Sequence, residues 1–413
     1  MLKRIVFAVM LLFTGLSIAQ NGTTSPYSFF GVGELKFRGT AENRAMGGTN
    51  VFSDSIHLNI QNPAGVANLK LVNFAAGGSY KYVNQQTETE SQNATATSLD
   101  YLAIGIPMGK FAASFGVLPL TTVGYKFESI TDSTVVQYTG TGGMNRVFLA
   151  FGYQVTSKFN LGIEANYNFG NVEKQTLISQ DEVQFGTSER IKSDLLGFNF
   201  TFGAEYRTMV SEDLELTTSA TYSPATNFTI KGYRELSSIL ISPSGIVVPV
   251  DTREETLEHV EVTFPSQFTF GAGIGSPKRW FIGAQYTNVK TSNFEDPELD
   301  FGTIQYLDSN KYRFGGFFIP RYNSFTSYWH RVVYRAGFRY EESGINVRGE
   351  DINEYGISFG VGLPIGKLFS NFNIGFELGS RGTITKGLIK ENFFNTFISL
   401  SLNDKWFEKR YID

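Results

Sequence analysis

The sequence contains no cysteine, so neither disulfides nor thiolate metal sites can contribute to its stability. It holds 12 prolines in 413 residues, and no Pro/Ser-rich linker or charge run divides it, which favours a single domain. The net charge of -4 comes without the clustered lysine and arginine that phosphate binding needs, so we expect no nucleic-acid partner. No hydrophobic run reaches the ~20 residues of a spanning helix.

The longest apolar stretch lies near the first residue. Two basic residues precede Ile5–Leu16, and the small residue Ala19 ends the stretch. This pattern predicts a secretory signal over residues 1–19, and its apolar part is too short to span a membrane. No cysteine near the cut offers a site for lipid attachment, so the exported protein must hold a membrane by its own surface.

Glycine and aromatic residues are abundant instead, with 43 Gly, 38 Phe and 20 Tyr. In residues 159–169 one face reads Phe, Leu, Ile, Ala, Tyr, Phe, while the other reads Asn, Gly, Glu, Asn, Asn. Residues 196–206 and 355–363 repeat this two-residue period. A soluble sandwich alternates too, but its outer face carries Lys and Glu, whereas this polar face is mostly Gly, Asn, Ser and Thr. The pattern therefore predicts an all-β fold, a transmembrane antiparallel barrel of an outer membrane.

Connection lengths predict the topology, because such barrels have tight periplasmic turns and longer outer loops. Short turns are expected near residues 107–110, 156–158, 211–213, 276–278 and 364–370. Long polar loops are expected near 83–96, 126–142, 173–191, 228–258, 292–309, 342–351 and 382–390. With a weaker strand at 311–320 and an inner turn through 321–328, about fourteen strands result. Trp280, Trp329 and Trp406 then all fall at the periplasmic rim.

Residues 20–66 do not alternate, and we interpret them as an N-terminal plug, or hatch, inside the barrel. The barrel itself is expected over residues 67–413, with a short periplasmic tail at its end. Within the plug, Asn62, Pro63, Ala64 and Gly65 form a turn motif, since Asn before Pro favours a turn. This motif either seats the plug against the wall or is an ordinary loop before the first strand.

Charged residues at inward positions form a second candidate group. Alternation points Glu164, Glu205, Arg207, Arg335, Arg339 and Glu377 into the lumen, with Arg44 of the plug as a candidate partner. Buried charges are costly unless paired. We therefore expect a salt-bridge network around the plug, and the alternative is a selectivity ring.

Three patches carry a family resemblance. Arg44–Gly48, Asn62–Ala67 and Phe264–Gly271 resemble the FadL/TodX long-chain fatty acid transporter family. The resemblance implies a fourteen-stranded barrel with a hatch, an outer pocket for hydrophobic compounds, and sideways release through a kinked third strand.

The expected third strand covers residues 111–127. It contains Pro119 between Gly116 and Gly124. Proline removes a ladder donor, so a local break is expected there. The alternative at this position is a bulge or an early loop.

Catalytic readings find little support. Gly356–Gly360 has the spacing of a nucleophile elbow but lies within an alternating strand, and three scattered histidines form no pair with it. We expect no enzyme activity, no cofactor and no metal site.

Two functions remain, and both place the barrel in outer-membrane lipid. The first is passive transport of hydrophobic, fatty-acid-like compounds, for which Phe314–Phe318, Phe393 and Phe397 would supply an outer pocket. The alternative is a non-transporting FadL-like barrel that serves as a subunit or docking partner of an outer-membrane assembly or secretion complex, with 317–320 and Trp406–Phe407 as the contact patch. Sequence does not separate them, although the third-strand proline favours transport.

Overall fold

We analysed a computed structural model of the chain, which describes residues 22–242, 247–294, 304–365 and 370–406. The expected signal over residues 1–19 lies outside this range. No helix in the described part is long and apolar enough to cross a membrane.

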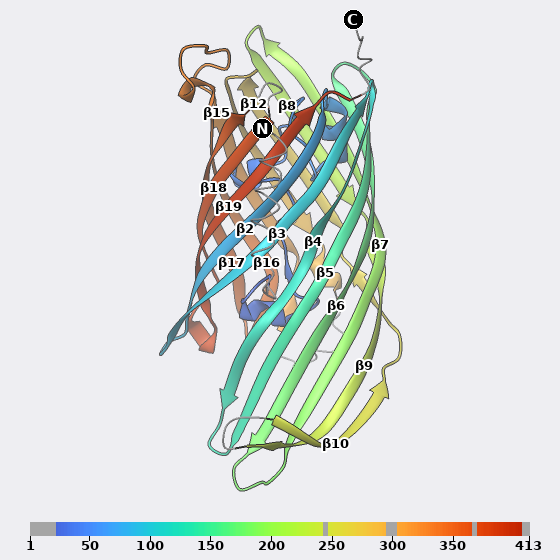
Figure 1. The fold of residues 1–413 in the computed structure, drawn as a ribbon, viewed down its shortest axis with the longest axis vertical. Coiled ribbons are helices and arrows are strands. Elements are labelled where there is room, and N and C mark those ends of the chain that lie inside the picture. The colour runs from blue at the N-terminus through green and yellow to red at the C-terminus, as the bar shows by residue number, and fades with distance from the viewer. Residues whose placement is uncertain (1–21, 243–246, 295–303, 366–369, 407–413) are drawn as a thin grey trace, which may run out of the picture.

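The chain forms a closed antiparallel barrel of 14 strands, as predicted. The ring closes where the last strand pairs with the first, from Lys390↔Gln86 to Asp404↔Val72. Figure 1 shows the tilted wall running from β2 in blue to β19 in red. Six uninterrupted strands begin the wall, and a seventh, β13, lies near its middle. They are β2 (Val72–Gln86), β3 (Ser91–Met108), β4 (Phe111–Ile130), β5 (Thr134–Gln154), β6 (Phe159–Gln180), β7 (Gly186–Ser211) and β13 (Trp280–Val289).

Other wall strands are split by irregular residues. β8 (Leu214–Ser223) continues as β9 (Thr226–Ile241), and β11 (Val260–Phe264) continues as β12 (Gln267–Ser276). The remaining wall elements are β14 (Ile304–Tyr306), β15 (Ser309–Phe318), β16 (Val333–Val347), β17 (Glu350–Ile365), β18 (Ser370–Arg381) and β19 (Lys390–Asp404), while β10 (Val247–Thr256) forms a hairpin with β9.

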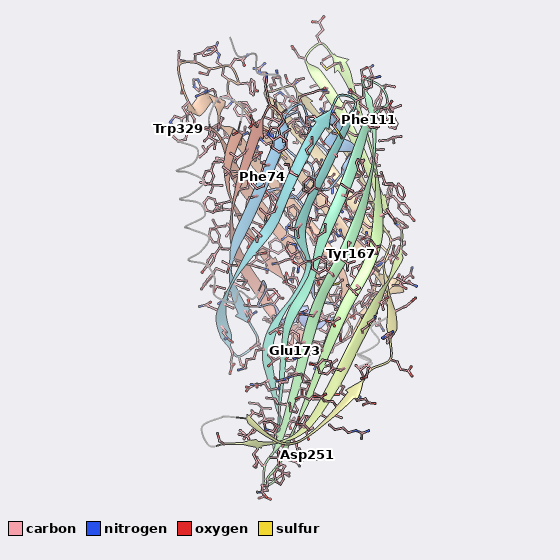
Figure 2. All side chains as sticks on the ribbon, turned by 45° about the vertical axis from the view of Figure 1, so that its right-hand side comes forward. Phe74, Phe111, Tyr167, Glu173, Asp251 and Trp329 are labelled. Carbon is pink, nitrogen blue, oxygen red and sulfur yellow. The ribbon has the colours of Figure 1, made fainter. Side chains whose placement is uncertain are left out.

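Alternation sorts the wall residues into two faces. On β7, Phe198, Phe200 and Phe202 point outward and are exposed, whereas Thr201 and Glu205 point into the lumen and are buried. Aromatic side chains cover the outer surface of the barrel in Figure 2. An outward apolar band around a closed sheet is the surface that lipid covers.

The two ends of the barrel differ. Tight connections join β3 to β4, β5 to β6, β7 to β8 and β12 to β13 at one end, which we call the short-turn end. At the opposite, long-hairpin end, β4 to β7, β9 and β10 extend far beyond β2 and β3 (Figure 1).

The predicted long loops were largely wrong. Segments 83–96, 126–142, 173–191 and 228–258 are mostly strand, joined by short turns such as Thr131–Ser133. Alternation fades in these extensions because both faces are polar beyond the lipid, although the backbone ladder continues. Sequence periodicity therefore located the lipid-covered part of each strand and missed its extension. Part of the expected loop 292–309 lies outside the described residues.

Residues 22–71 fold inside the barrel (Figure 1). Their elements are η1 (Pro26–Phe29), β1 (Glu34–Leu35), α2 (Ala41–Arg44) and η2 (Pro63–Asn68). The first wall strand begins at Val72 rather than near residue 67, because η2 runs to Asn68 before the chain enters the wall. A capping box between Thr40 and Asn43 starts α2. We call residues 22–71 the plug.

Glycines let the plug backbone approach the wall. A Cβ on Gly315 would lie 2.0 Å from the carbonyl oxygen of Met46, and one on Gly337 would lie 2.1 Å from the nitrogen of Gly47. Gly47 N also donates to Ser358 Oγ at 2.9 Å. The plug is therefore in backbone contact with β15 and β16, and a hydrogen bond joins it to a side chain of β17.

Candidate functional site

The third wall strand, β4, leaves its neighbour β3 part of the way along the barrel. The shared ladder runs from Met108↔Phe111 to Leu102↔Val117 and stops there. Both strands continue toward the long-hairpin end, β3 to Ser91 and β4 to Ile130. In these parts β3 keeps its pairing with β2, and β4 keeps its pairing with β5, but the two strands no longer pair with each other. The wall is thus interrupted sideways between β3 and β4. We call this interruption the seam.

Each strand carries a register shift just beyond the last shared pair. In β4 the shift lies between Pro119 and Thr121, so Leu120 is the extra residue. In β3 the residue without a partner is Asp100, opposite the step from Gly77 to Gly78. A bulge bends its strand and disrupts pairing, and proline has no N–H to offer a neighbour. The local sequence therefore turns the two strands apart.

The three residues predicted for the opening lie along this path. Gly116 pairs with Ala103 within the shared ladder, Pro119 marks the shift, and Gly124 lies in the seam. Sequence reasoning missed Asp100, because a single extra residue in β3 has no signature without its partner strand.

The plug fills the seam as a substitute neighbour of β4. β1 pairs with it through Glu34↔Thr122 and Leu35↔Thr121. Lys36 N donates to the carbonyl of Leu120 at 3.0 Å.

Two glycines let the plug approach the edge of β4 closely. Gly124 N donates to Ser28 Oγ at 3.1 Å, and a Cβ on Gly124 would lie 2.0 Å from the carbonyl oxygen of Thr23. Gly33 has a φ of +100°, and a Cβ there would lie 2.7 Å from the carbonyl oxygen of Thr122. Residues 22–36 thus occupy the place that β3 has left.

An apolar cluster lies in the lumen beside the seam, toward the long-hairpin end. The ring of Phe29 of the plug lies 5.2 Å from Tyr125, 5.5 Å from Phe127 and 5.9 Å from Tyr138 of the wall, between ring centroids. We call it the outer apolar cluster. Its buried members are Leu120, Val123, Tyr125, Met144, Val172, Leu195, Phe228, Ile230 and Val262.

Ion pairs fix the plug on the opposite side of the lumen. Arg339 pairs with Glu377 at 2.6 Å and with Glu341 at 3.4 Å, and also contacts Glu354. Arg44 of the plug joins the same carboxylate of Glu377 at 3.2 Å and reaches Asp100, the bulge residue, at 3.4 Å. One network thus connects plug, wall and seam.

The other predicted lumen charges lie in separate groups. Glu164 is paired by Arg38 of the plug at 2.5 Å. Glu205 binds Arg207 at 2.7 Å and accepts from Asn68 Nδ2 at 2.7 Å.

Arg335 differs from the rest of the predicted group. It donates to the amide oxygen of Asn373 at 3.1 Å. Within the described residues no carboxylate lies within 4.0 Å of it, so the predicted single network is in fact several groups plus one amide-bound arginine.

Sequence reasoning missed Glu34, which pairs with Arg381 at 2.7 Å and with Lys81 at 3.7 Å. Glu34 belongs to the plug, where no periodicity predicts direction.

The Asn62 motif contacts the wall at β5 to β7. Asn62 Oδ1 accepts from Ala64 N at 3.0 Å, and its Nδ2 donates to the carbonyl of Ala204 at 3.2 Å. Cβ atoms on Gly162 and Gly203 would collide with Pro63 and Asn62. Gly65 packs on the Ser53 hydroxyl of the plug, which a Cβ would approach to 2.4 Å.

The phenylalanines expected to form an outer pocket serve other contacts. Phe393 and Phe397 are buried under Lys81 and Arg44, with cation-to-centroid distances of 4.8 and 5.1 Å. Phe314 and Phe318 lie on strand β15 and face outward, away from the lumen. Phe407 lies outside the described residues.

The residues with the spacing of a nucleophile elbow also have a structural role. Ser358 lies within β17 and accepts the bond from Gly47. His57 pairs with Asp54 at 2.6 Å. No group of three potential metal ligands occurs in the described part of the chain.

A closed antiparallel barrel of 14 strands, with a plug from its own N-terminal residues and an interrupted third strand, defines the fold class of the FadL-type barrels. Solved structures match it across most of their length. A TodX monoaromatic hydrocarbon channel mutant, deltaS2S3, gives a TM-score of 0.62 at 17% identity, covering 89% of this chain and 100% of that one. The Pseudomonas putida toluene transporter TodX gives 0.60 at 16% identity, covering 90% and 98%. A Pseudomonas aeruginosa FadL homologue gives 0.59 at 12%, covering 89% and 98%.

A sequence model of the BamG family, described by that name alone, matches residues 1–413. The chain belongs to the BamG family. No curated protein matches it.

Proposed function

We propose that this protein is an outer-membrane channel through which hydrophobic compounds pass passively, with the seam as their lateral route. The observation that carries the proposal is the separation of β3 from β4 beyond the pair Leu102↔Val117. A closed ladder would offer no sideways path, since every backbone group in lipid must be paired. The strands that extend far beyond the lipid-covered band place the long-hairpin end outside and the short-turn end in the periplasm.

The contents of the seam support this role. The wall strands hold each other by long ladders, whereas the plug meets the edge of β4 through two residue pairs and a few further hydrogen bonds. The same segment is also tied to β18 and β19, where Glu34 pairs with Arg381 at 2.7 Å and Ser25 Oγ donates to Glu391 at 2.8 Å, so opening must break these contacts too. A short segment of this kind still opens at lower free-energy cost than the long ladders of the wall. Displacing residues 22–36 would connect the outer apolar cluster with the surrounding lipid while the rest of the barrel stays intact.

The names of two structural relatives support passage of a hydrophobic compound. TodX is described as a toluene transporter and a monoaromatic hydrocarbon channel. We propose that this chain likewise passes a hydrophobic compound. We propose fatty-acid-like molecules as its substrate class.

A second candidate is a barrel that does not transport and that serves as a subunit or docking partner of an outer-membrane complex. One observation favours it. Phe393 and Phe397, which could have lined a pocket, are buried against the plug, and the ion pairs of Arg339 and Arg44 fix that packing.

Purification in mild detergent, followed by mass spectrometry of co-eluting lipids and proteins, tests both. A bound fatty-acid-like compound that is lost in Val123→Trp, which fills the outer apolar cluster, supports transport. The control is Val147→Trp, because Val147 lies on the outward face of neighbouring β5. An empty lumen with a stoichiometric protein partner rejects transport and supports the second candidate.

A further inference from the structure

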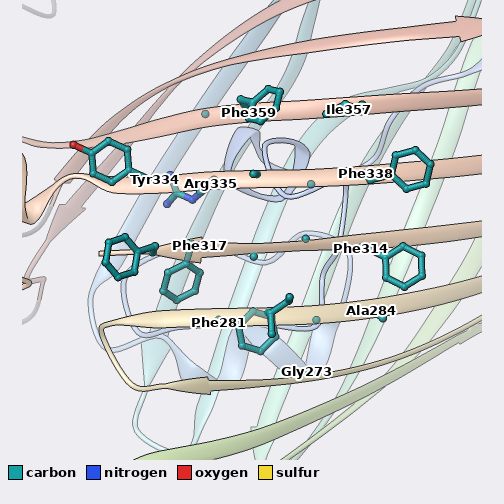
Figure 3. A pocket seen from close by; sticks show the side chains of 18 of the residues that line it. Gly273, Phe281, Ala284, Phe314, Phe317, Tyr334, Arg335, Phe338, Ile357 and Phe359 are labelled. Carbon is teal, nitrogen blue, oxygen red and sulfur yellow. The ribbon is translucent and has the colours of Figure 1, made fainter. Parts of the chain in front are cut away.

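The outer face of the barrel contains a hollow at the part of the wall that has the plug directly behind it. It has a volume of about 1250 Å³ and lies over strands β12 to β18. Its floor is made of small outward residues, Ala284, Gly316 and Ala336. Larger outward residues bound it, among them Phe314 and Phe338, which face each other across β15 and β16. Figure 3 shows these two rings and that of Phe359 around the hollow.

The depth of the hollow has a cause inside the barrel. The lumen-facing residues behind it are glycines, Gly315 and Gly337, because the plug backbone of Met46 and Gly47 lies directly against them. Gly316 and Ala336, which are paired neighbours, leave the other side of the same strands almost bare. The wall here is little thicker than its backbone. The plug backbone therefore supports the thin wall beneath the hollow from the lumen side.

A basic rim lies at the short-turn end of the hollow. The turn between β12 and β13 carries Lys278 and Arg279, and the connection from β15 to β16 carries Arg321 and Arg331. All four are exposed, and neither segment contains Asp or Glu. Within the described residues no carboxylate lies within 4.0 Å of any of them.

The two basic segments are in direct contact. Ile319 N donates to the carbonyl of Arg279 at 2.6 Å, and the Lys278 ammonium lies 5.4 Å from the ring centroid of Tyr322. Trp329 is exposed on the same connection and lies near the short-turn end of the barrel (Figure 2). Tryptophan side chains gather where a membrane meets water.

We propose that the hollow and its basic rim together bind an anionic phospholipid of the periplasmic leaflet. The acyl chain fills the apolar hollow, which lies within the lipid-covered band. The phosphate meets the four cations, which have no carboxylate of the described residues within 4.0 Å. Each cation near a membrane surface adds to the attraction for anionic lipid, so four of them discriminate strongly between headgroups of different charge. This inference does not rest on the proposed transport.

The test uses the full-length protein in detergent, with native mass spectrometry after exposure to phosphatidylglycerol or to phosphatidylethanolamine. The wild type is expected to retain phosphatidylglycerol in preference. The double variant Arg321→Gln/Arg331→Gln is expected to lose about tenfold or more of this preference. The control Lys110→Gln/Lys158→Gln removes two cations from other short turns and is expected to change nothing.

The hollow is tested separately by filling it. Ala284→Leu/Ala336→Leu is expected to reduce retention of both lipids, whereas Ala204→Leu, on the outward face of β7, is not. Gel mobility before and after heating shows whether each barrel has folded.

Equal retention of the two lipids, or no effect of the arginine changes, overturns the proposal. So does a co-purified protein that is lost when the hollow is filled, since that partner would then be its occupant. Loss of transport by itself leaves lipid retention unchanged, so the two proposals fail independently.

Discussion

At the scale of single residues, the lumen charges were the most predictable part of the candidate site. Glu164, Glu205, Arg339 and Glu377 lie on strict two-residue alternation, and all four point inward as that period requires. Their partners were less predictable. Arg38 and Glu34 belong to the plug, where no period fixes direction, and their pairing needs the tertiary structure.

Arg339 lies among three carboxylates, so its removal leaves buried negative charge without compensation. Arg339→Met is expected to lower the free energy of unfolding by about 3–5 kcal/mol, measured by denaturant titration of the folded barrel. Arg190→Met is the control, because Arg190 pairs with Glu173 at 3.3 Å where both are about one-third exposed. That pair is expected to contribute ~0–1 kcal/mol. Equal losses in the two variants would contradict the buried network.

His57 gives the plug a pH dependence. Burial opposes its charge, but the neighbouring Asp54 carboxylate outweighs this and raises the pKa of His57 above its ordinary value, while His57 holds the pKa of Asp54 below its own. The stabilisation from His57 is thus complete below about pH 6.5 and is lost as pH rises through the folded-state pKa. The share from Asp54 is lost as pH falls below about 4.

The melting temperature should therefore fall in His57→Gln relative to wild type, with the largest difference between about pH 4 and 6.5 and a smaller one at pH 9. His330→Gln, on the exposed rim, is the control. A difference that does not change with pH would show that the pair has no ionic character.

At the scale of elements, composition and alternation predicted the strands and the antiparallel ring, because lipid on one side and a packed lumen on the other impose a two-residue period. Residue patterns alone did not predict the seam, although the family resemblance implied a sideways opening at the third strand. Pro119 signalled a break in one strand, but a seam requires the loss of pairing between two, and the shift at Asp100 has no sequence signature. Similarly, the polar strand extensions resembled loops.

The contact of β1 with β4 is the weak element of the site, and Gly33 holds it at close approach. Gly33→Val introduces a side chain against the Thr122 backbone at a φ that valine rarely adopts, and is expected to detach residues 22–36 from the seam. The chain has no native cysteine, so Ser28→Cys provides a single, buried reporter.

A water-soluble thiol reagent should modify this cysteine slowly in Ser28→Cys itself and at least about tenfold faster when Gly33→Val is added. That factor corresponds to a loss of ~1.4 kcal/mol or more in the free energy that keeps residues 22–36 in the seam. Gly78→Ala is the control, since its nearest contact would be 3.1 Å away. Unchanged reactivity would mean that the plug stays in the seam without this glycine.

At the scale of the whole molecule, the plug is held in two ways. Ion pairs and glycine-mediated backbone contacts fix its later residues to β15 to β18. Its first residues meet β4 through a ladder of two pairs, and side chains such as Glu34 and Ser25 tie them to β18 and β19. This asymmetry allows a local opening without unfolding the ring. It is the physical basis of the proposed lateral route.

The most direct test locks that opening. Leu35 and Thr121 are cross-strand partners of β1 and β4, and such partners lie within the Cα separation that a disulfide accepts. In Leu35→Cys/Thr121→Cys, uptake of a fluorescent fatty acid into liposomes carrying the protein should stop on oxidation and return on reduction. Thr176→Cys/Glu189→Cys, a partner pair on β6 and β7, is the control and should transport in both states. Full uptake through the oxidised seam would contradict the lateral route.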